Sequence, residues 1–225
     1  MVRHSPLALA VLAMLTESPM HPYRMQQLIK ARGKDEVINV GQRNSLYQTI
    51  DRMLRNDLIA VYEIERDGAF PERTVYAITD AGRDTGRLWL REQLAQPARE
   101  FPAFPAALSF LPLLAPDDVC RQLAIRVGAL ERELERLDAG TAEAQAIDVP
   151  RLFLLESELI RAQLVAELDW VRGVVADLQS GVITWSAAWL EEIAQRFTLA
   201  ADSTTYQPNK PAKSTKPAAK KGSRK

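Results

Sequence analysis

The spacing of hydrophobic residues changes from a helical repeat to a strand repeat within the first 96 residues, which strongly limits the fold. Up to about residue 56, apolar residues recur every three or four positions in the segments 5–19, 21–33 and 39–56. Ser5 and Pro6 are typical of a helix start, because serine caps the first turn and proline is tolerated at its first position. Three successive helices are therefore expected.

Two strands are predicted to follow. Residues 58–66 and 73–79 are rich in β-branched and aromatic side chains that partly alternate with polar ones. The segment DGAFPE between them contains an Asp-Gly pair and a proline, which favour a short connection. Helical spacing returns in residues 79–96. The expected apolar residues of that helix are Leu88, Leu90 and Leu94.

The second and third helices each have a predicted inward stripe. In the second, the stripe consists of Tyr23, Met25, Leu28 and Ile29. In the stretch 44–59, which spans most of the third helix and the start of the first strand, the apolar residues at helical spacing are Leu46, Ile50, Met53, Leu54, Leu58 and Ile59. Asn39 and Gln42 fit a capping box at the start of the third helix. In such a box, each of the two side chains accepts a hydrogen bond from the backbone N–H of the other residue.

Three helices followed by a hairpin form the layout of a winged helix-turn-helix, whose third helix enters the DNA major groove. The residues expected to face the bases are the polar ones near the start of that helix: Gln42, Arg43, Asn44, Tyr47 and Gln48. Arginine can pair with guanine, asparagine and glutamine with adenine, and tyrosine with phosphate. Further along, Arg52 and Arg55 are expected at phosphates, and Arg66 and Arg73 flank the tip of the wing. The alternative is that this face is an ordinary solvated helix surface.

Charge is unevenly distributed along the chain, although the 29 basic and 29 acidic residues cancel. Residues 1–96 hold 13 basic and 12 acidic residues, a weak positive balance for a DNA-binding domain. Residues 97–209 are acidic, whereas residues 210–225 hold seven Lys or Arg and no acid. The Lys-, Pro- and Ala-rich segment 201–225 is predicted to be a disordered basic tail. It would add non-specific DNA affinity, rest on the acidic half of the chain, or only aid solubility.

The C-terminal half is predicted to be a helical dimerisation domain. Residues 116–140 carry a heptad-like apolar seam, and residues 150–181 read as one long helix with two apolar stripes. One partner helix cannot cover two stripes, so self-association is expected. A last helix is predicted over residues 184–197. The predicted dimer contacts are Leu123, Val127, Leu130, Leu134, Leu164, Leu168, Val171 and Val175.

No catalytic, metal or cofactor site is predicted. His4 and His21 are the only histidines, and the sequence has no glycine-rich phosphate loop or nucleophile motif. Trp170, Trp185 and Trp189 allow either a pocket for a small aromatic effector or a helical core or dimer interface. The chain has one cysteine, no signal-peptide pattern and no apolar run of the ~18 residues that a membrane span needs, which favours a cytoplasmic, nucleoid-associated protein.

Three motifs in residues 5–90 resemble the PadR family of bacterial transcriptional regulators. They are Ser45-Leu46-Tyr47 at the start of the third helix, His21 and Tyr23 at the start of the second, and Tyr76, Ile78, Thr79 and Gly82 at the end of the wing. The resemblance adds Ser45, His21 and Tyr23 to the DNA-binding candidates, and it implies a homodimer that usually represses transcription. Asn44 and Gln48 stand where the family often has glycine and proline, so the operator sequence does not follow from the resemblance.

The sequence thus predicts a mainly α-helical chain with a small β-hairpin. The expected parts are a winged helix-turn-helix domain (1–96), a helical dimerisation or effector domain (97–200) and the basic tail. The favoured function is a sequence-specific double-stranded DNA-binding repressor, released by an unknown signal. The alternatives are a low-specificity architectural DNA-binding protein that uses its tail, and a helical adaptor that binds protein. An enzyme is not expected.

Overall fold

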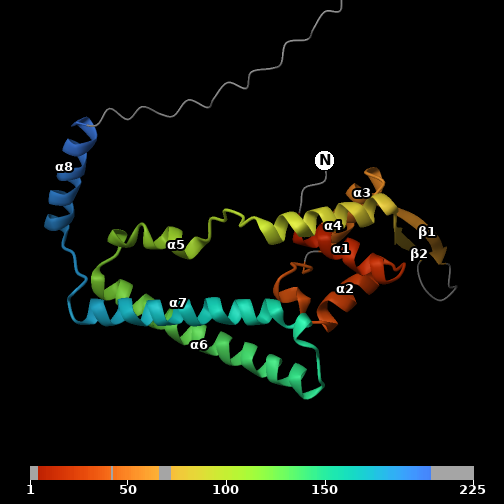
Figure 1. Ribbon diagram of the computed structural model, residues 1–225. Helices are drawn as coiled ribbons and strands as arrows, with labels where there is room; N and C mark the ends of the chain where they lie inside the picture. The colour runs from red at the N-terminus through yellow and green to blue at the C-terminus, as the bar shows by residue number, and fades with distance from the viewer. Residues whose placement is uncertain (1–4, 42, 66–71, 204–225) are drawn as a thin grey trace, which may run out of the picture. The chain divides into compact units, whose positions relative to one another are not determined.

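A computed structural model describes residues 5–41, 43–65 and 72–203 (Figure 1). The chain divides into two compact units, residues 1–102 and 103–225, each with its own hydrophobic core. The sequence placed this boundary at residue 97, in the segment that follows the first unit's last helix. Within the described residues, no helix is long and apolar enough to cross a membrane.

The first unit has the predicted order of three helices, a hairpin and a helix. Its elements are α1 (Pro6–Glu17), α2 (Pro22–Ala31), the short 3₁₀ turn η1 (Lys34–Glu36), α3 (Arg43–Arg55), β1 (Ile59–Glu65), β2 (Arg73–Ile78) and α4 (Asp80–Ala95). Ser5 starts α1 as expected, since its hydroxyl accepts a hydrogen bond from the Ala8 N–H at 3.1 Å. The predicted fold class, mainly α with a two-stranded antiparallel hairpin, is confirmed.

The core of the first unit joins all four α-helices to the base of the hairpin. Its most deeply buried side chains are Val11, Leu12, Leu15, Met25, Ile50, Met53 and Ile59. Burying a side chain of this size contributes about 1.5–3 kcal/mol, so these contacts dominate the stability of the unit. The stripe of α3 is therefore fixed inward, and its opposite face is turned outward.

The hairpin is anchored at its base and leaves its far end projecting. Ile59 pairs with Ile78, and a bulge interrupts the register between Val61 and Glu63. Met20 forms an isolated bridge with Tyr76, in which each backbone N–H donates to the other's carbonyl at 3.1 Å. This bridge ties β2 to the junction between α1 and α2, so it fixes the wing beside the start of α2.

Two local predictions in the first unit are wrong. Tyr23 is exposed, because α2 turns Pro22, Met25 and Ile29 inward. In α4, Trp89 is the buried large side chain, whereas the apolar residues Leu88, Leu90 and Leu94 are exposed. The large indole fills the contact with the core, so helical rotation places its neighbours outside. Asn39 does not cap α3, since its side-chain oxygen accepts from the Gly41 N–H instead. Its predicted capping partner Gln42 lies outside the described residues.

The second unit is built on a pair of long antiparallel helices, α6 (Pro116–Ala146) and α7 (Leu155–Gln179), which lie side by side (Figure 1). The other elements are α5 (Ala103–Leu108), the 3₁₀ turns η2 (Leu111–Leu113) and η3 (Arg151–Phe153), and α8 (Ala187–Ser203). The sequence did not predict α5 and ended α6 too early. Residues 150–154, predicted to be the start of a long helix, form η3 and a turn before α7 begins.

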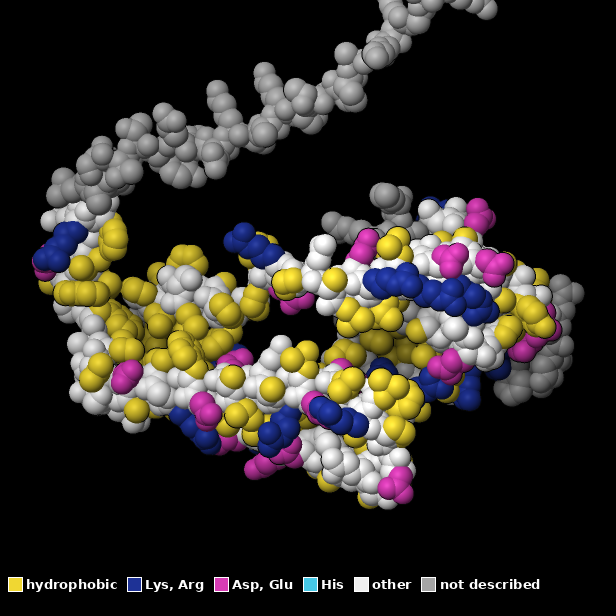
Figure 2. All heavy atoms as spheres, in the orientation of Figure 1, with side chains coloured by type: hydrophobic (Ala, Val, Ile, Leu, Met, Phe, Trp, Pro, Cys, Tyr) yellow, Lys and Arg dark blue, Asp and Glu magenta, His cyan; other side chains and the backbone are white. Residues whose placement is uncertain are grey.

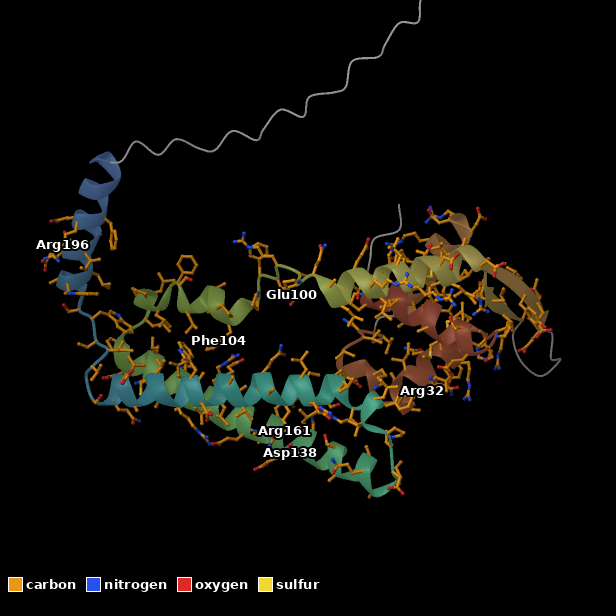
Figure 3. All side chains as sticks on the ribbon, in the orientation of Figure 1. Arg32, Glu100, Phe104, Asp138, Arg161 and Arg196 are labelled. Carbon is orange, nitrogen blue, oxygen red and sulfur yellow. The ribbon has the colours of Figure 1, made fainter. Side chains whose placement is uncertain are left out.

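Ion pairs join α6 to α7 on their outer sides. Arg161 donates to both carboxylate oxygens of Asp138, and these two labelled side chains point toward one another in Figure 3. Arg172 pairs with Glu131 at 2.7 Å. Arg126 Nε donates to Glu167 at 2.7 Å. Pairs as exposed as the first two contribute little energy each, but they fix the register of the two helices.

The eight predicted dimer contacts all lie in the core between α6 and α7 of one chain. Leu123, Leu130, Leu168 and Val171 are buried there by their own chain, and contact of the eight residues with a second chain stays a prediction. Val127, Leu134, Leu164 and Val175 are only partly buried. Heptad spacing predicts that a seam is covered, but it does not distinguish a neighbouring helix of the same chain from a second chain.

Candidate nucleic-acid interface

Helix α3 presents one buried face and one polar face. Leu46, Ile50 and Met53 are at most 2% exposed, whereas Tyr47 is 51% exposed and Gln48 is also exposed. Thr49 is buried, and its hydroxyl donates to the Ser45 carbonyl at 2.7 Å, which satisfies it within the helix. The inward packing thus fixes which side of α3 can contact a partner.

The predicted site residues fall into three groups. Tyr47 and Gln48 lie exposed on α3, while Ser45 and Arg52 are half-buried there. Arg43 and Asn44 form the first turn of α3, although only their backbone is described. Gln42 and Arg66 lie outside the described residues. The remaining three, His21, Tyr23 and Arg73, come from other elements.

A hollow of about 360 Å³ brings residues from three elements together. Its lining includes His21 and Tyr23 from the start of α2, Tyr47 from α3, and Arg73 and Tyr76 from β2. Four of these five were predicted as DNA-binding candidates from separate parts of the sequence. The bridge between Met20 and Tyr76 brings these residues together, because it holds β2 beside the first turn of α2.

The His21 side chain lines this hollow. It caps α2, and its Nδ1 accepts from the Arg24 N–H at 3.1 Å. With Nδ1 used as an acceptor, a neutral imidazole carries its proton on Nε2. The ring stacks on Tyr23, with 6.2 Å between centroids and 12° between planes. The N-terminus of α2 also carries the positive end of the helix dipole, which favours an anion.

The electrostatics of the hollow are mixed. Arg73 contributes a positive charge, whereas Glu72 lines the same hollow and Asp51 is exposed on α3. Burial raises the pKa of Tyr76, a hydrogen bond with Thr74 opposes this, and Asp51 and Tyr47 raise it further. Tyr76 therefore stays neutral at physiological pH. The hollow suits one anionic group held mainly by hydrogen bonds, and not a dense row of phosphates.

Tyr76 and Thr74 were not predicted as site residues. Tyr76 was noted only as part of the motif that closes the wing, and that motif has a structural role as well. Thr79 caps α4 by accepting from the Gly82 N–H at 3.0 Å, and its hydroxyl donates to the Asp57 carbonyl at 2.7 Å. These two bonds tie α4, the end of β2 and the turn after α3 together. Among the described residues, no three His, Cys, Asp or Glu side chains lie close enough together to hold a metal ion.

The predicted tryptophans do not gather at one site. Trp170 is half-exposed on α7 and meets the Phe104 ring edge-on at 6.3 Å, Trp185 Nε1 donates to the Leu114 carbonyl at 3.0 Å, and Trp189 is exposed on α8. Within the described residues, the apolar groove of the second unit is lined by α5, the segment after it and α6, and by none of the three tryptophans. Their role as effector or dimer residues stays a prediction.

Comparison with known proteins finds one matching family model, within the first unit. Residues 11–87 match the model of the "Transcriptional regulator PadR-like family". No curated protein matches the sequence. Among solved structures, PadR from Bacillus subtilis in complex with operator DNA matches with a TM-score of 0.65 and 15% identity, over 77% of this chain and 99% of that one.

Two further structures have the same fold. PadR from Bacillus subtilis in complex with p-coumaric acid matches with a TM-score of 0.63 and 15% identity, over 77% of this chain and 98% of that one. The Vibrio cholerae virulence activator AphA matches with a TM-score of 0.61 and 20% identity, again over 77% and 98%. At these identities the likeness establishes the fold of both units. The family resemblance noted in residues 5–90 is confirmed by the match over 11–87.

Proposed function

Because residues 11–87 belong to the PadR-like family of transcriptional regulators, we propose that this chain is a sequence-specific, double-stranded DNA-binding regulator that acts as a homodimer. The observation that carries the proposal is the hollow shared by His21, Tyr23, Tyr47 and Arg73. These side chains come from α2, α3 and the wing, the three elements that a winged helix-turn-helix lays against DNA. A DNA partner would place the protein at the nucleoid.

Two kinds of contact follow from this arrangement. Residues Gln42 to Gln48 would contact base edges and carry the sequence preference. The hollow would hold a backbone phosphate, with hydrogen bonds from His21 Nε2 and the tyrosine hydroxyls and a charge contact from Arg73. Phosphate contacts fix the register of the helix in the groove. Arg52, Arg66 and Arg55 would extend the backbone contacts.

Self-association is supported by an apolar stripe that the chain leaves largely exposed. Leu152, Leu155 and Leu159 are 70%, 46% and 60% exposed, and Trp170, which meets the Phe104 ring, is 50% exposed. The other stripe of α7 packs on α6, so the exposed one is free to meet a second copy. A two-fold dimer would present two α3 helices about one DNA turn apart, ~34–36 Å, and would partly compensate for the weak charge of each domain.

We propose that the chain represses transcription and that a signal releases it from its operator. The operator complex and the p-coumaric acid complex of Bacillus subtilis PadR support a DNA-bound regulator with an effector, whereas AphA is described as an activator. A reporter gene under the selected operator distinguishes the two: deletion of this regulator raises expression if it represses. Titration with p-coumaric acid, followed by operator release, tests an aromatic effector.

The test is selection of genomic fragments bound by the full chain, followed by affinity measurements on the enriched site. One inverted repeat is expected, bound at least ~10³-fold more tightly than random DNA. Tyr47→Ala should weaken operator binding markedly while the dimer persists, because it removes a phosphate contact that fixes the register of α3. Arg91→Ala is the matched control, since Arg91 is exposed on α4 and does not line the hollow. Unchanged operator affinity in Tyr47→Ala would contradict the site assignment.

The two other functions give different results in the same experiment. An architectural protein would enrich no single motif and would lose most of its binding when residues 208–225 are removed. A protein-binding adaptor would retain no fragment above background. Enrichment of one repeat by both the full chain and the shortened chain excludes both alternatives.

A further inference from the structure

The first turn of α3 depends for its position on the residues that precede it. Among the described side chains of this helix, Leu46 is the first buried one, and Ile50 and Met53 continue the buried face into the core. Ser45, just before Leu46, is only half-buried, whereas Val40 in the turn before the helix is 2% exposed. The way in which Val40 is held therefore decides where α3 begins in space.

The side chain of Val40 packs between the first two helices. It forms a small core with Ala10 of α1 and Ile29 of α2. Asn39 stiffens the same turn, since its side-chain oxygen accepts from the Gly41 N–H at 3.2 Å. Apolar burial keeps Val40 inside the unit, but it is non-directional and does not fix where the backbone points.

One side-chain hydrogen bond gives this anchor a direction. Gln26 Nε2 on α2 donates to the Val40 carbonyl at 2.8 Å, and the two residues are 14 positions apart in the sequence. The carbonyl of a residue so well buried needs a partner, because leaving it unsatisfied costs free energy. The bond therefore sets the distance between α2 and the backbone just before α3 begins at Arg43.

The Gln26 side chain also adjoins the proposed DNA-binding surface. It is half-buried, and it lines a hollow of about 60 Å³ together with Pro22, Tyr23, Leu46 and Tyr47. The sequence did not predict Gln26 as a site residue, because it belongs to none of the motifs in residues 5–90. Its position links the turn before α3 to the two exposed tyrosines.

Charge does not orient the first unit strongly on a DNA duplex. Figure 2 shows Lys and Arg side chains next to Asp and Glu over this unit, and residues 1–96 carry 13 basic and 12 acidic residues. A surface of mixed sign steers a charged partner weakly. Accurate placement of α3 therefore has to come from packing and hydrogen bonds inside the unit.

We propose that Gln26 is a positioning residue for base reading: its hydrogen bond to the Val40 carbonyl sets where the first turn of α3 lies, and so which base edges residues 42–48 reach. This inference rests on the proposed DNA-binding function. Hydrogen bonds to bases fail with small displacements, whereas the attraction of a cation to phosphate falls off slowly with distance. Loss of the Gln26 bond should therefore lower sequence preference more than general affinity for DNA.

The test compares Gln26→Met with Gln27→Met in the full chain. Methionine keeps the length and helix propensity of glutamine but has no N–H to donate. Gln27, the next residue of α2, is exposed and serves as the matched control. Circular dichroism first checks that both variants are folded. Fluorescence anisotropy then gives the Kd for the selected inverted repeat, for its single-base-pair variants and for a random duplex of the same length.

The preference for the operator is measured as the Kd for random DNA divided by the Kd for the repeat. In Gln26→Met this ratio should fall at least ~10-fold for each half-site, about the value of one misplaced base contact. The Kd for random DNA should change less than about 2-fold, because phosphate contacts dominate it. The loss should be spread over several base pairs, since the whole first turn moves. Gln27→Met should match the native chain.

Four results would overturn the proposal. A native ratio in Gln26→Met would mean that the bond does not place α3. An equal fall in operator and random-DNA affinity would assign Gln26 to phosphate contact or to stability. A loss confined to one base pair would make Gln26 itself a base-reading residue, and an equal loss in Gln27→Met would mean that any change on α2 suffices.

Failure of the proposed function gives a different result. A native chain that prefers no repeat over random DNA would refute sequence-specific binding, and this inference with it. The four results above all require a native chain with a clear preference, so the two failures are distinguishable.

Discussion

Gly82 lies so close to the backbone of Leu58 that a Cβ atom at residue 82 would overlap the Leu58 carbonyl oxygen and crowd the side chain of Ile78. Helix α4 therefore rests directly on the turn between α3 and β1. The same carbonyl accepts a hydrogen bond from the Thr79 N–H at 3.1 Å. The end of α3, the hairpin and α4 are joined at this point, so their packing depends on a residue without a side chain.

Gly82→Ala should destabilise the first unit by about 3 kcal/mol, because the obstructing atoms belong to the backbone and cannot rotate away. Gly86→Ala, one turn later on α4, is the matched control. A Cβ atom there would meet only the Leu12 side chain at 3.4 Å, and alanine favours the helix by about 0.5–1 kcal/mol. Urea denaturation followed by circular dichroism measures both. Similar stability of the two variants would contradict the close approach.

Thr79→Val should cost about 1–2 kcal/mol, since it removes both the cap of α4 and the hydrogen bond to the Asp57 carbonyl while keeping the side-chain volume. Thr79→Ser retains the hydroxyl and should lose much less. The difference in urea midpoint between these two variants measures the contribution of the hydroxyl to stability. If valine and serine behave alike, the two hydrogen bonds do not stabilise the unit.

His21→Asn should separate folding from DNA binding. Asparagine is a good helix cap and can accept from the Arg24 N–H, so stability should change by less than about 0.5 kcal/mol. It has no donor at the position of Nε2, so operator affinity should fall by about 10- to 150-fold, the value of about 1.5–3 kcal/mol for one lost hydrogen bond to a charged group. Fluorescence anisotropy on the selected operator measures this. If the variant binds the operator normally, His21 does not contact a phosphate.

Glu17 and Arg32 should give the first unit a small pH dependence. Arg32 donates to both oxygens of Glu17 at 2.6 and 2.7 Å, and this hydrogen bonding lowers the pKa of Glu17 below its usual 4.5. A carboxyl with a lowered pKa stabilises the fold above its unfolded value and loses this contribution as pH falls through the folded value. Both side chains are well exposed, so the gain is less than about 1 kcal/mol.

Glu17→Gln is therefore expected to be slightly less stable than the native chain at pH 7, and equally stable once the pH is well below 4.5. Denaturation at several pH values gives the difference. A gap between the two proteins that is constant over this range would show that the carboxylate charge is not involved.

The basic tail should control the salt dependence of DNA binding without changing its sequence preference. Residues 210–225 hold seven positive charges, and their removal should reduce the slope of log K against log salt by up to about 6 per protomer if all of them meet phosphates. The ratio of operator to random-DNA affinity should stay the same, because phosphate contacts are independent of sequence and both affinities fall alike. An unchanged slope would leave the tail without a role at DNA.

The sequence by itself determined the elements whose cause is local. Period and capping residues are properties of neighbouring positions, so the three helices, the hairpin and α4 could be predicted, as could the buried face of α3. The family motifs also made His21, Tyr23 and Tyr47 candidates for DNA binding. The sequence could not rank Leu88, Leu90 and Leu94 against Trp89, because helical spacing does not say which way a helix is rotated against its core.

Only the tertiary structure decided which distant residues meet. The bridge from Met20 to Tyr76 brings the wing to α2 and creates the hollow shared by Tyr23, Tyr47 and Arg73, although no local pattern links these segments. It also showed that the heptad seam of α6 is covered within its own chain, which leaves the second stripe of α7 and the edge of α8 exposed. Periodicity states that an apolar face must be buried; the identity of its partner depends on chain topology, which is not local.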